Sequence, residues 1–323
     1  MPHRLATLVA LLLLFGGPVF AKTTVTVAFL RDINNLPLFH AEASGAFARQ
    51  GITVVNRPLN DGAAAAAAVA SGAADIGYAA VAIPIAARDA GQPLRIFISN
   101  GYEIYPYTPN MTVLLASRGS GVTTIAGLKG RKVVVNAISG GCALMLFDQL
   151  RHAGLPRDSV QILVAPFPQI PAILRLREAA AACTVEPFWT LMRHDPALAP
   201  TVLAYGTLAG QKKGASDVLS GYFASRTWLA AHRDLAGRFL AALRAAQREL
   251  AGHPALYRAE LVKYFGLKPA IAGQISMELT PDRMVARPAQ YRSILDAMAR
   301  SHMLKHPLTA EQLVMTVLPP KGK

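Results

Sequence analysis

The turn at Ser139, Gly140 and Gly141 has the residue types that best suit the binding of a small anion. It lies where a strand predicted at 131–136 gives way to a helix predicted at 141–153. Backbone N–H groups and the Ser139 hydroxyl can point at a ligand there, glycine allows close approach, and the helix dipole favours negative charge. The turn therefore predicts a site for an oxyanion. Because an ordinary helix cap has the same residues, that alternative stays open.

Other polar and aromatic side chains stand near the ends of predicted strands. In open α/β sheets the ligand crevice lies outside the carboxyl ends of the strands, where the following helices begin. That rule selects four loops, at 31–37, 77–81, 136–142 and 186–189, which would face each other across a cleft. The candidate ligand-binding residues outside the turn are Asn34, Asn35, Tyr78, Ala79, Asn100, Glu186 and Trp189.

Several of these candidates have a structural alternative. Asn34 and Asn35 offer both donors and acceptors, yet they also suit an Asx turn. Tyr78 and Trp189 can line an apolar wall or pack between two lobes. Glu186 can bind an amine or an arginine of the opposite lobe, or cap the next helix. If the ligand is an anion, Glu186 is expected to orient a lobe residue rather than meet the ligand.

Motifs for covalent or metal chemistry are missing from the sequence. It has no GxSxG elbow, no GxxxxGK[ST] loop, no GxGxxG after a strand and no CxxC pair. His302 and His306 have i, i+4 spacing, but no acidic residue accompanies them and Pro307 would end the helix. We therefore predict no catalytic residue, no metal and no cofactor.

Two cysteines, Cys142 and Cys183, fall in the same predicted lobe. They can pair in an oxidising compartment, and two buried free thiols are the alternative. A disulfide needs a particular Cα separation, which a sequence does not supply, so both possibilities stay open.

The elements that must position these residues alternate between short β-rich runs and longer Ala- and Leu-rich runs. This rhythm predicts mostly parallel sheets covered by helices, in two similar lobes. Strands are expected at 24–30, 52–57, 74–78, 94–99, 131–136, 160–165, 181–186 and 218–224. Helices are expected at 38–49, 62–70, 81–90, 141–153, 170–180, 229–250, 255–265 and 291–303.

Loose joints at 118–121 and 206–217 divide the chain. They predict a first lobe at 22–117, a second lobe at 118–217, and a return to the first lobe with C-terminal helices at 218–323. About 300 mature residues exceed the usual size of one hydrophobic core, which agrees with two lobes.

The first 21 residues have the features of a secretory signal. A basic Arg4 precedes an apolar run at 5–15 and a Gly-Gly-Pro break at 16–18, and Val19 and Ala21 suit signal peptidase. Cleavage after Ala21 would export the protein to the periplasm. A short buried N-terminal helix is the alternative. The apolar run is too short to span a bilayer, which takes about 20 residues.

The composition excludes some partners. Hydrophobic residues make up 52% of the chain and charged residues 16%, as in a compact globular protein. The formal charge is +14, but the basic residues are dispersed and form no tract interleaved with aromatics, so nucleic acid is excluded. A basic field favours anionic small molecules or an acidic membrane partner.

A series of short motifs resembles the periplasmic solute-binding proteins of the nitrate/sulfonate/taurine type, a group that includes the thiamine-pyrimidine-binding relatives. The motifs follow in the expected order over about 24–250: LFHAEASGAFARQGITVV from Leu38, ASGAADIG from Ala70, AGQPL from Ala90, GLKGRKV from Gly127, HAGL from His152, and Glu186-Pro187.

The resemblance implies a type II periplasmic-binding fold, an α/β architecture of two doubly wound lobes joined by a two-crossover hinge. It implies a monomer that captures a small solute and delivers it to an ABC permease. Together with the oxyanion turn, this predicts a small anion of the sulfonate or carboxylate type. The alternative is a sensor or an enzyme on the same lobes, because fold does not settle function.

Two departures from the family pattern bear on the site. Relatives usually carry Gly and Asp before the Glu-Pro strand, where this chain has Glu178 and Ala181. The second-lobe site is therefore not a copy of a familiar pocket. The cysteine cluster of the pyrimidine-synthesising relatives is also missing, which disfavours that enzyme activity.

Overall fold

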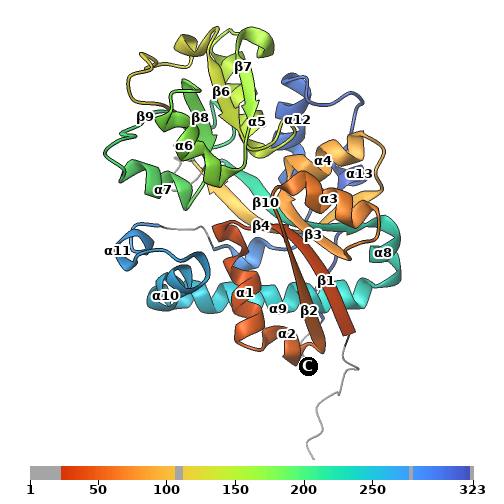
Figure 1. Ribbon diagram of the computed structural model, residues 1–323. Coiled ribbons are helices and arrows are strands. Elements are labelled where there is room, and N and C mark those ends of the chain that lie inside the picture. Colours follow the sequence, from red (N-terminus) through yellow and green to blue (C-terminus); the bar gives the residue numbers. More distant parts are fainter. Residues whose placement is uncertain (1–22, 106–111, 276–278, 321–323) are drawn as a thin grey trace, which may run out of the picture.

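The chain forms two five-stranded sheets, each covered by helices (Figure 1). The structure, a computed structural model, describes residues 23–105, 112–275 and 279–320. The predicted signal at 1–21 lies outside these ranges. Within them, no helix has the combination of length and apolar character needed to cross a bilayer.

The first sheet has the strand order β2-β1-β3-β10-β4. Its strands are β1 (Thr23–Leu30), β2 (Ile52–Leu59), β3 (Ile76–Ala80), β4 (Leu94–Ile104) and β10 (Ser216–Ser225). Strand β1 pairs in parallel with β2 and β3, whereas β10 pairs antiparallel with both β3 and β4. Four of the five strands therefore run in the same direction, as predicted, and β10, the strand that returns from the second lobe, runs antiparallel between β3 and β4.

Helices cover both faces of the first sheet. On one face, the long helix α9 (Arg233–Gly252) packs Phe239 and Leu243 against Val25 and Val27 of β1. The other face is covered by α3 (Gly62–Ala70), α4 (Ala82–Asp89) and α12 (Arg292–Arg300). The other helices of this lobe are α1 (Leu36–Ala43), α2 (Ala46–Arg49), α8 (Arg226–Ala231), α10 (Pro254–Phe265), α11 (Pro269–Ala272) and α13 (Ala310–Leu313).

The helix predicted at 38–49 is interrupted in the structure. Helix α1 ends at Ala43 and α2 begins at Ala46, with Gly45 between them at a φ of 73°. This left-handed backbone conformation cannot continue an α-helix, and glycine adopts it without a steric penalty. By contrast, α3 has the predicted bounds, and the Asp61 side chain caps it by accepting from the Ala64 N–H.

The second sheet has the strand order β7-β6-β8-β5-β9. Its strands are β5 (Val113–Ala116), β6 (Lys132–Val135), β7 (Gln161–Val164), β8 (Ala181–Thr184) and β9 (Thr201–Tyr205), with helices α5 (Gly141–His152), α6 (Ile170–Arg175) and α7 (Phe188–Arg193). The sequence predicted neither β5 nor β9. Since β5 pairs with β8 and β9, the chain enters the second lobe before Val113 rather than at 118.

A disulfide joins the start of α5 to β8. Cys142 and Cys183 are paired, with their Cα atoms 5.4 Å apart. The two cysteines therefore form a disulfide and are not two buried free thiols. The bond fixes the first turn of α5 on the sheet of its own lobe, at the edge that faces the first lobe.

Candidate functional site

A narrow cleft lies between the two lobes, in which the centres of water molecules have a volume of about 40 Å³ to occupy. The first lobe and the returning strand contribute Leu30, Asp32, Asn34, Gly62, Ala80, Ile83, Leu219 and Ser220. The remaining lining residues, most of them from the second lobe, are Thr112, Asn136, Gly140, Gly141, Cys142, Phe167 and Val185. Because both lobes line it, the shape of this cleft depends on how the lobes are positioned.

The predicted loops contribute unequally to the lining. The first loop supplies Asp32 and Asn34, the second supplies Ala80, and the third supplies Gly140 and Gly141 along with two further residues. The fourth loop, 186–189, does not line the cleft, and only Val185 just before it does. The carboxyl-end rule thus locates the cleft, but not every side chain in it.

Asp32 is held in place by two hydrogen bonds to the same carboxylate oxygen. The Asn34 N–H donates to Oδ1 at 2.9 Å, and the Tyr78 hydroxyl donates to Oδ1 at 3.0 Å. The first contact makes Asp32 the N-cap of a short 3-10 helix, η1 (Ile33–Asn35). Asp32 is only 7% exposed. A buried carboxyl group therefore faces the cleft from the end of β1.

Burial changes the acidity of this group. It raises the pKa of the Asp32 carboxyl to about 6, against the opposing effect of the hydrogen bonds from Tyr78 and Asn34. Burial and the nearby Asp32 charge also raise the pKa of Tyr78 well above its ordinary value, so the phenol remains a donor. At neutral pH the cleft thus holds an ionised, poorly hydrated carboxylate.

We expect Asp32→Asn to stabilise the protein above pH 6. The pKa of Asp32 is raised from 3.8 to about 6 in the folded protein. Below pH 4 the buried carboxyl group is neutral and does not lower wild-type stability. Stability then falls as the pH rises to about 6, because the group has to ionise in a buried position. A shift of this size corresponds to about 3 kcal/mol, which the amide avoids while still accepting both hydrogen bonds. Urea unfolding of both proteins between pH 4 and 7.5 measures the difference. A stability difference that does not change with pH would contradict this assignment.

The first turn of α5 reaches the cleft without a side-chain cap. Gly140 is its N-cap residue in an extended conformation, and no side chain bonds the free N–H groups of the turn. A Cβ placed on Gly141 would stand 3.6 Å from the Cβ of Ala80 in the first lobe. The positive end of this helix therefore lies against the opposite wall of the cleft. Ser139, in contrast, is half-buried and outside the lining.

Three of the predicted residues have structural contacts instead of lining the cleft. Asn35 is fully buried, donates to the Leu30 carbonyl at 2.8 Å and accepts from the Tyr222 hydroxyl at 3.2 Å. Tyr78 acts on the cleft through Asp32, as described above. Ala79 is fully buried in the core, and its neighbour Ala80 is the residue that lines the cleft.

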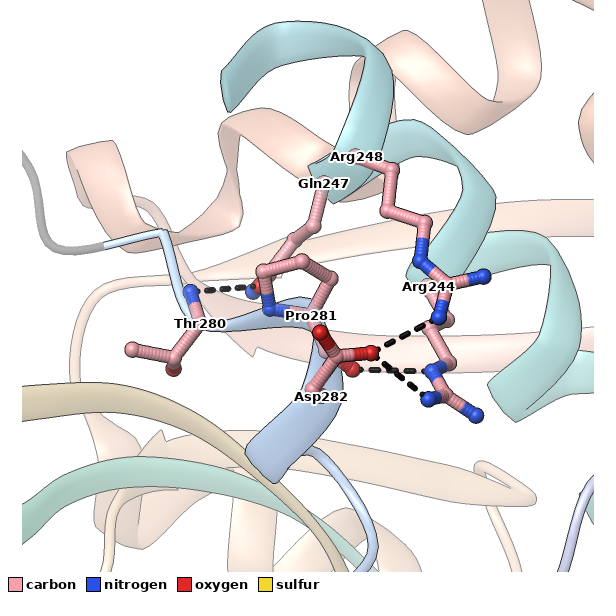
Figure 2. Close-up of polar contacts among 6 residues, drawn as sticks. All are labelled: Arg244, Gln247, Arg248, Thr280, Pro281 and Asp282. Carbon is pink, nitrogen blue, oxygen red and sulfur yellow. Dashed lines mark hydrogen bonds and ion pairs between the residues drawn. The ribbon is translucent and has the colours of Figure 1, made fainter. Parts of the chain in front are cut away.

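Asn100 belongs to a buried relay behind the cleft. Its side-chain amide donates to the Asn34 carbonyl at 2.7 Å, and Gln247 of α9 donates to its oxygens at 3.2 and 3.3 Å. Figure 2 shows the far end of this relay, where Gln247 accepts from the Thr280 N–H beside the ion pairs of Asp282. The relay ties the Asn34 loop to α9, so Asn100 positions the site and does not line it.

Glu186 caps α7 from a buried position. Its carboxylate accepts from the Thr190 hydroxyl at 2.8 Å and from the Thr190 N–H at 3.2 Å. Burial raises its pKa to about 7, with these hydrogen bonds opposing the shift. Of the alternatives considered for Glu186, the structure has the helix cap.

Trp189 is buried beside the cleft and packs within its own lobe. Its indole ring meets Tyr205 edge-on at 6.4 Å, and the Arg193 guanidinium lies 5.7 Å from its centroid. It is 3% exposed and outside the lining. Trp189 is therefore a packing residue and does not form a wall of the ligand site.

Several lining residues were missed by sequence reasoning. Asp32 and Asn136 lie inside predicted loops, and the rule that selected those loops was the only signal for them. Ser220 comes from the returning strand β10 and Phe167 from the segment before α6, and nothing in the sequence linked either to the cleft. Among the described residues, no three His, Cys, Asp or Glu side chains gather where they could hold a metal ion.

The comparisons with known proteins agree with this architecture. A family model described as NMT1/THI5 like matches residues 32–256. The chain belongs to this family. The nitrate/sulfonate/taurine-type resemblance predicted from the motif series is thereby confirmed. No curated protein is significantly similar to the chain in sequence.

Solved structures of binding proteins share the fold at low identity. The alkanesulfonate-binding protein SsuA from Xanthomonas axonopodis pv. citri, bound to MOPS, is 18% identical with a TM-score of 0.73, over 91% of this chain and 99% of its own. SsuA from Escherichia coli is 18% identical with a TM-score of 0.71, over 93% and 94%. The nitrate-binding protein NrtA from Synechocystis PCC 6803 is 14% identical with a TM-score of 0.69, over 88% and 83%. The predicted type II periplasmic-binding fold is confirmed.

Proposed function

We propose that this protein is the exported, monomeric solute-binding component of an ABC importer, with no enzymatic activity. It would capture a small solute in the cleft between the lobes and deliver it to a permease in the inner membrane. The observation that carries this proposal is a cleft lined by both lobes, in a chain that passes twice between them. Such an arrangement suits capture by hinge closure.

The lobes touch on both sides of the cleft. On one side α5 contacts α4 and α12, and Arg157 donates to the His302 carbonyl at 3.0 Å. On the other side the Gln274 side chain accepts from Arg193 at 3.0 Å and is 2.6 Å from His194 Nε2. A solute enclosed by these contacts has to enter while the lobes are apart. The arrangement therefore supports a cycle of opening and closing.

The α5 turn is the proposed holder of the acidic group of the solute. Its support is the uncapped first turn, with Gly140 and Gly141 in the cleft lining. Because Ser139 lies outside the lining, the proposal rests on backbone N–H groups rather than on its hydroxyl. A sulfonate or carboxylate group has the charge and the acceptor oxygens for this position.

Solute-induced compaction tests the proposal. Native mass spectrometry first identifies the solute that co-purifies, and small-angle scattering then compares the protein with and without it. We expect a smaller radius of gyration with solute. A saturating solute that leaves the radius of gyration unchanged would rule out hinge closure.

A further inference from the structure

The charge of the ionisable groups in the cleft does not favour the binding of a simple anion. Among the described residues that line it, none is Lys, Arg or His. Asp32 is the ionisable side chain there, since the thiol of Cys142 is in a disulfide. The strongly basic balance of the whole chain is therefore not present in the site. An anion would find the dipole of α5 on one wall and a carboxylate on the other.

Buried hydrogen-bond donors hold the Asp32 carboxyl group in position. This carboxyl group is more than nine-tenths buried and is fixed by the Asn34 N–H and the Tyr78 hydroxyl, with smaller contributions from the Asn35 N–H and the Asn34 side chain. Tyr78 is itself fully buried, and its ring lies 5.0 Å from that of Tyr222. These donors stabilise the ionised form, yet burial deprives it of water. A carboxylate in this state gains most from a cationic partner.

The basic residue nearest in sequence is already engaged elsewhere. Arg31 lines an outer hollow that shares Leu30 and Phe167 with the cleft. Its guanidinium donates to the Tyr264 carbonyl and lies 5.7 Å from the centroid of the Phe265 ring. It is therefore not a counter-ion of Asp32 in this structure, and the outer hollow leaves room for the rest of a solute.

We propose that the captured solute carries an amine or amino nitrogen that binds the Asp32 carboxylate. This inference rests on the proposed function and narrows its substrate class from anions in general to amine-bearing solutes. A zwitterion fits both walls, with its acidic group at the first turn of α5 and its ammonium group at Asp32. An anion without an amine would be repelled by a desolvated carboxylate.

Calorimetry on matched pairs of probes tests this inference. The pairs are 2-aminoethanesulfonate with ethanesulfonate, 3-aminopropionate with propionate, and benzylamine with benzyl alcohol. We expect wild-type protein to bind an amine-bearing member about tenfold to a hundredfold more tightly than its partner. Asp32→Asn, which keeps the shape and both accepted hydrogen bonds, should remove that preference. Tyr78→Phe, which removes one donor to the carboxylate, should change it less.

Two results would overturn the amine inference. One is a wild-type protein that prefers the amine-free members, and the other is an Asp32→Asn variant that keeps the wild-type preference for amines. Scattering on the same samples separates this failure from a failure of the proposed function. If amine-free probes bind and compact the protein, solute capture stands and the amine inference falls. If probes bind but none compacts the protein, the proposed function fails, and the inference that rests on it fails too.

Discussion

Gly141→Trp should abolish solute binding while leaving the protein folded. A Cβ at this position already meets Ala80 of the opposite lobe at 3.6 Å, which is ordinary contact, so an indole ring has to occupy the cleft itself. We expect the affinity for the co-purified solute to fall more than about a hundredfold, because the ring holds the lobes apart and covers the first turn of α5. Calorimetry measures the loss, and circular dichroism confirms the fold.

Gly141→Ala is the matched control. Its methyl group fits at the Ala80 contact distance, so binding should change by no more than a few fold. Wild-type affinity in the Trp variant, with a normal unfolding transition, would mean that the solute binds away from α5.

Removing the disulfide should have the second-largest effect. It should lower the free energy of unfolding. Cys142 and Cys183 are separated by 41 residues, and closing a loop of this length typically contributes about 2–5 kcal/mol. We expect the double variant Cys142→Ala/Cys183→Ala to lose that amount in urea unfolding. Solute affinity should fall as well, because the bond fixes the start of α5 and Cys142 lines the cleft.

Reduction of the wild-type protein supplies the control for this second prediction. A thiol reductant should lower wild-type stability toward that of the double variant and leave the variant unchanged. Equal stability of the oxidised wild type and the variant would show that the disulfide does not support the second lobe.

Helices and turns that depend only on neighbouring residues could be predicted from the sequence. Helix α3 follows from its alanines and the Asp61 cap, and the strand-to-helix turn at Gly140 and Gly141 follows from residue type. What depends on distant pairing was not predictable. Strand β10 inserts between β3 and β4 after the chain has built the whole second lobe, and no pattern in its own residues records those partners.

The short strand β5 shows the same limit at a domain boundary. Its four residues are all buried and apolar, and β5 is the next strand in the sequence after the long strand β4 of the first lobe. Only its pairing with β8 and β9 places it in the second lobe. The joint predicted at 118–121 from its composition therefore lies a few residues after the point where the chain enters the second lobe.

Asp32 was missed for a comparable reason. An acidic residue before Ile33 has the sequence signature of an ordinary N-cap, and it does cap η1. Its second donor is the hydroxyl of Tyr78, 46 residues further along the chain, and its burial arises only when the tertiary structure forms. The site residues that were predicted, Asn34, Gly140 and Gly141, act through strand and helix ends, whereas Asp32 acquires its character from the tertiary fold.

The position of the bound solute tests the central claim most directly. A crystal structure of the protein grown with its co-purified solute should show that solute between the lobes. Its polar atoms should lie within hydrogen-bond distance of the Asp32 carboxylate and of the N–H groups that begin α5. Solute found elsewhere, for example in the basic hollow at Arg118 and Arg177, with this cleft empty, would contradict the account.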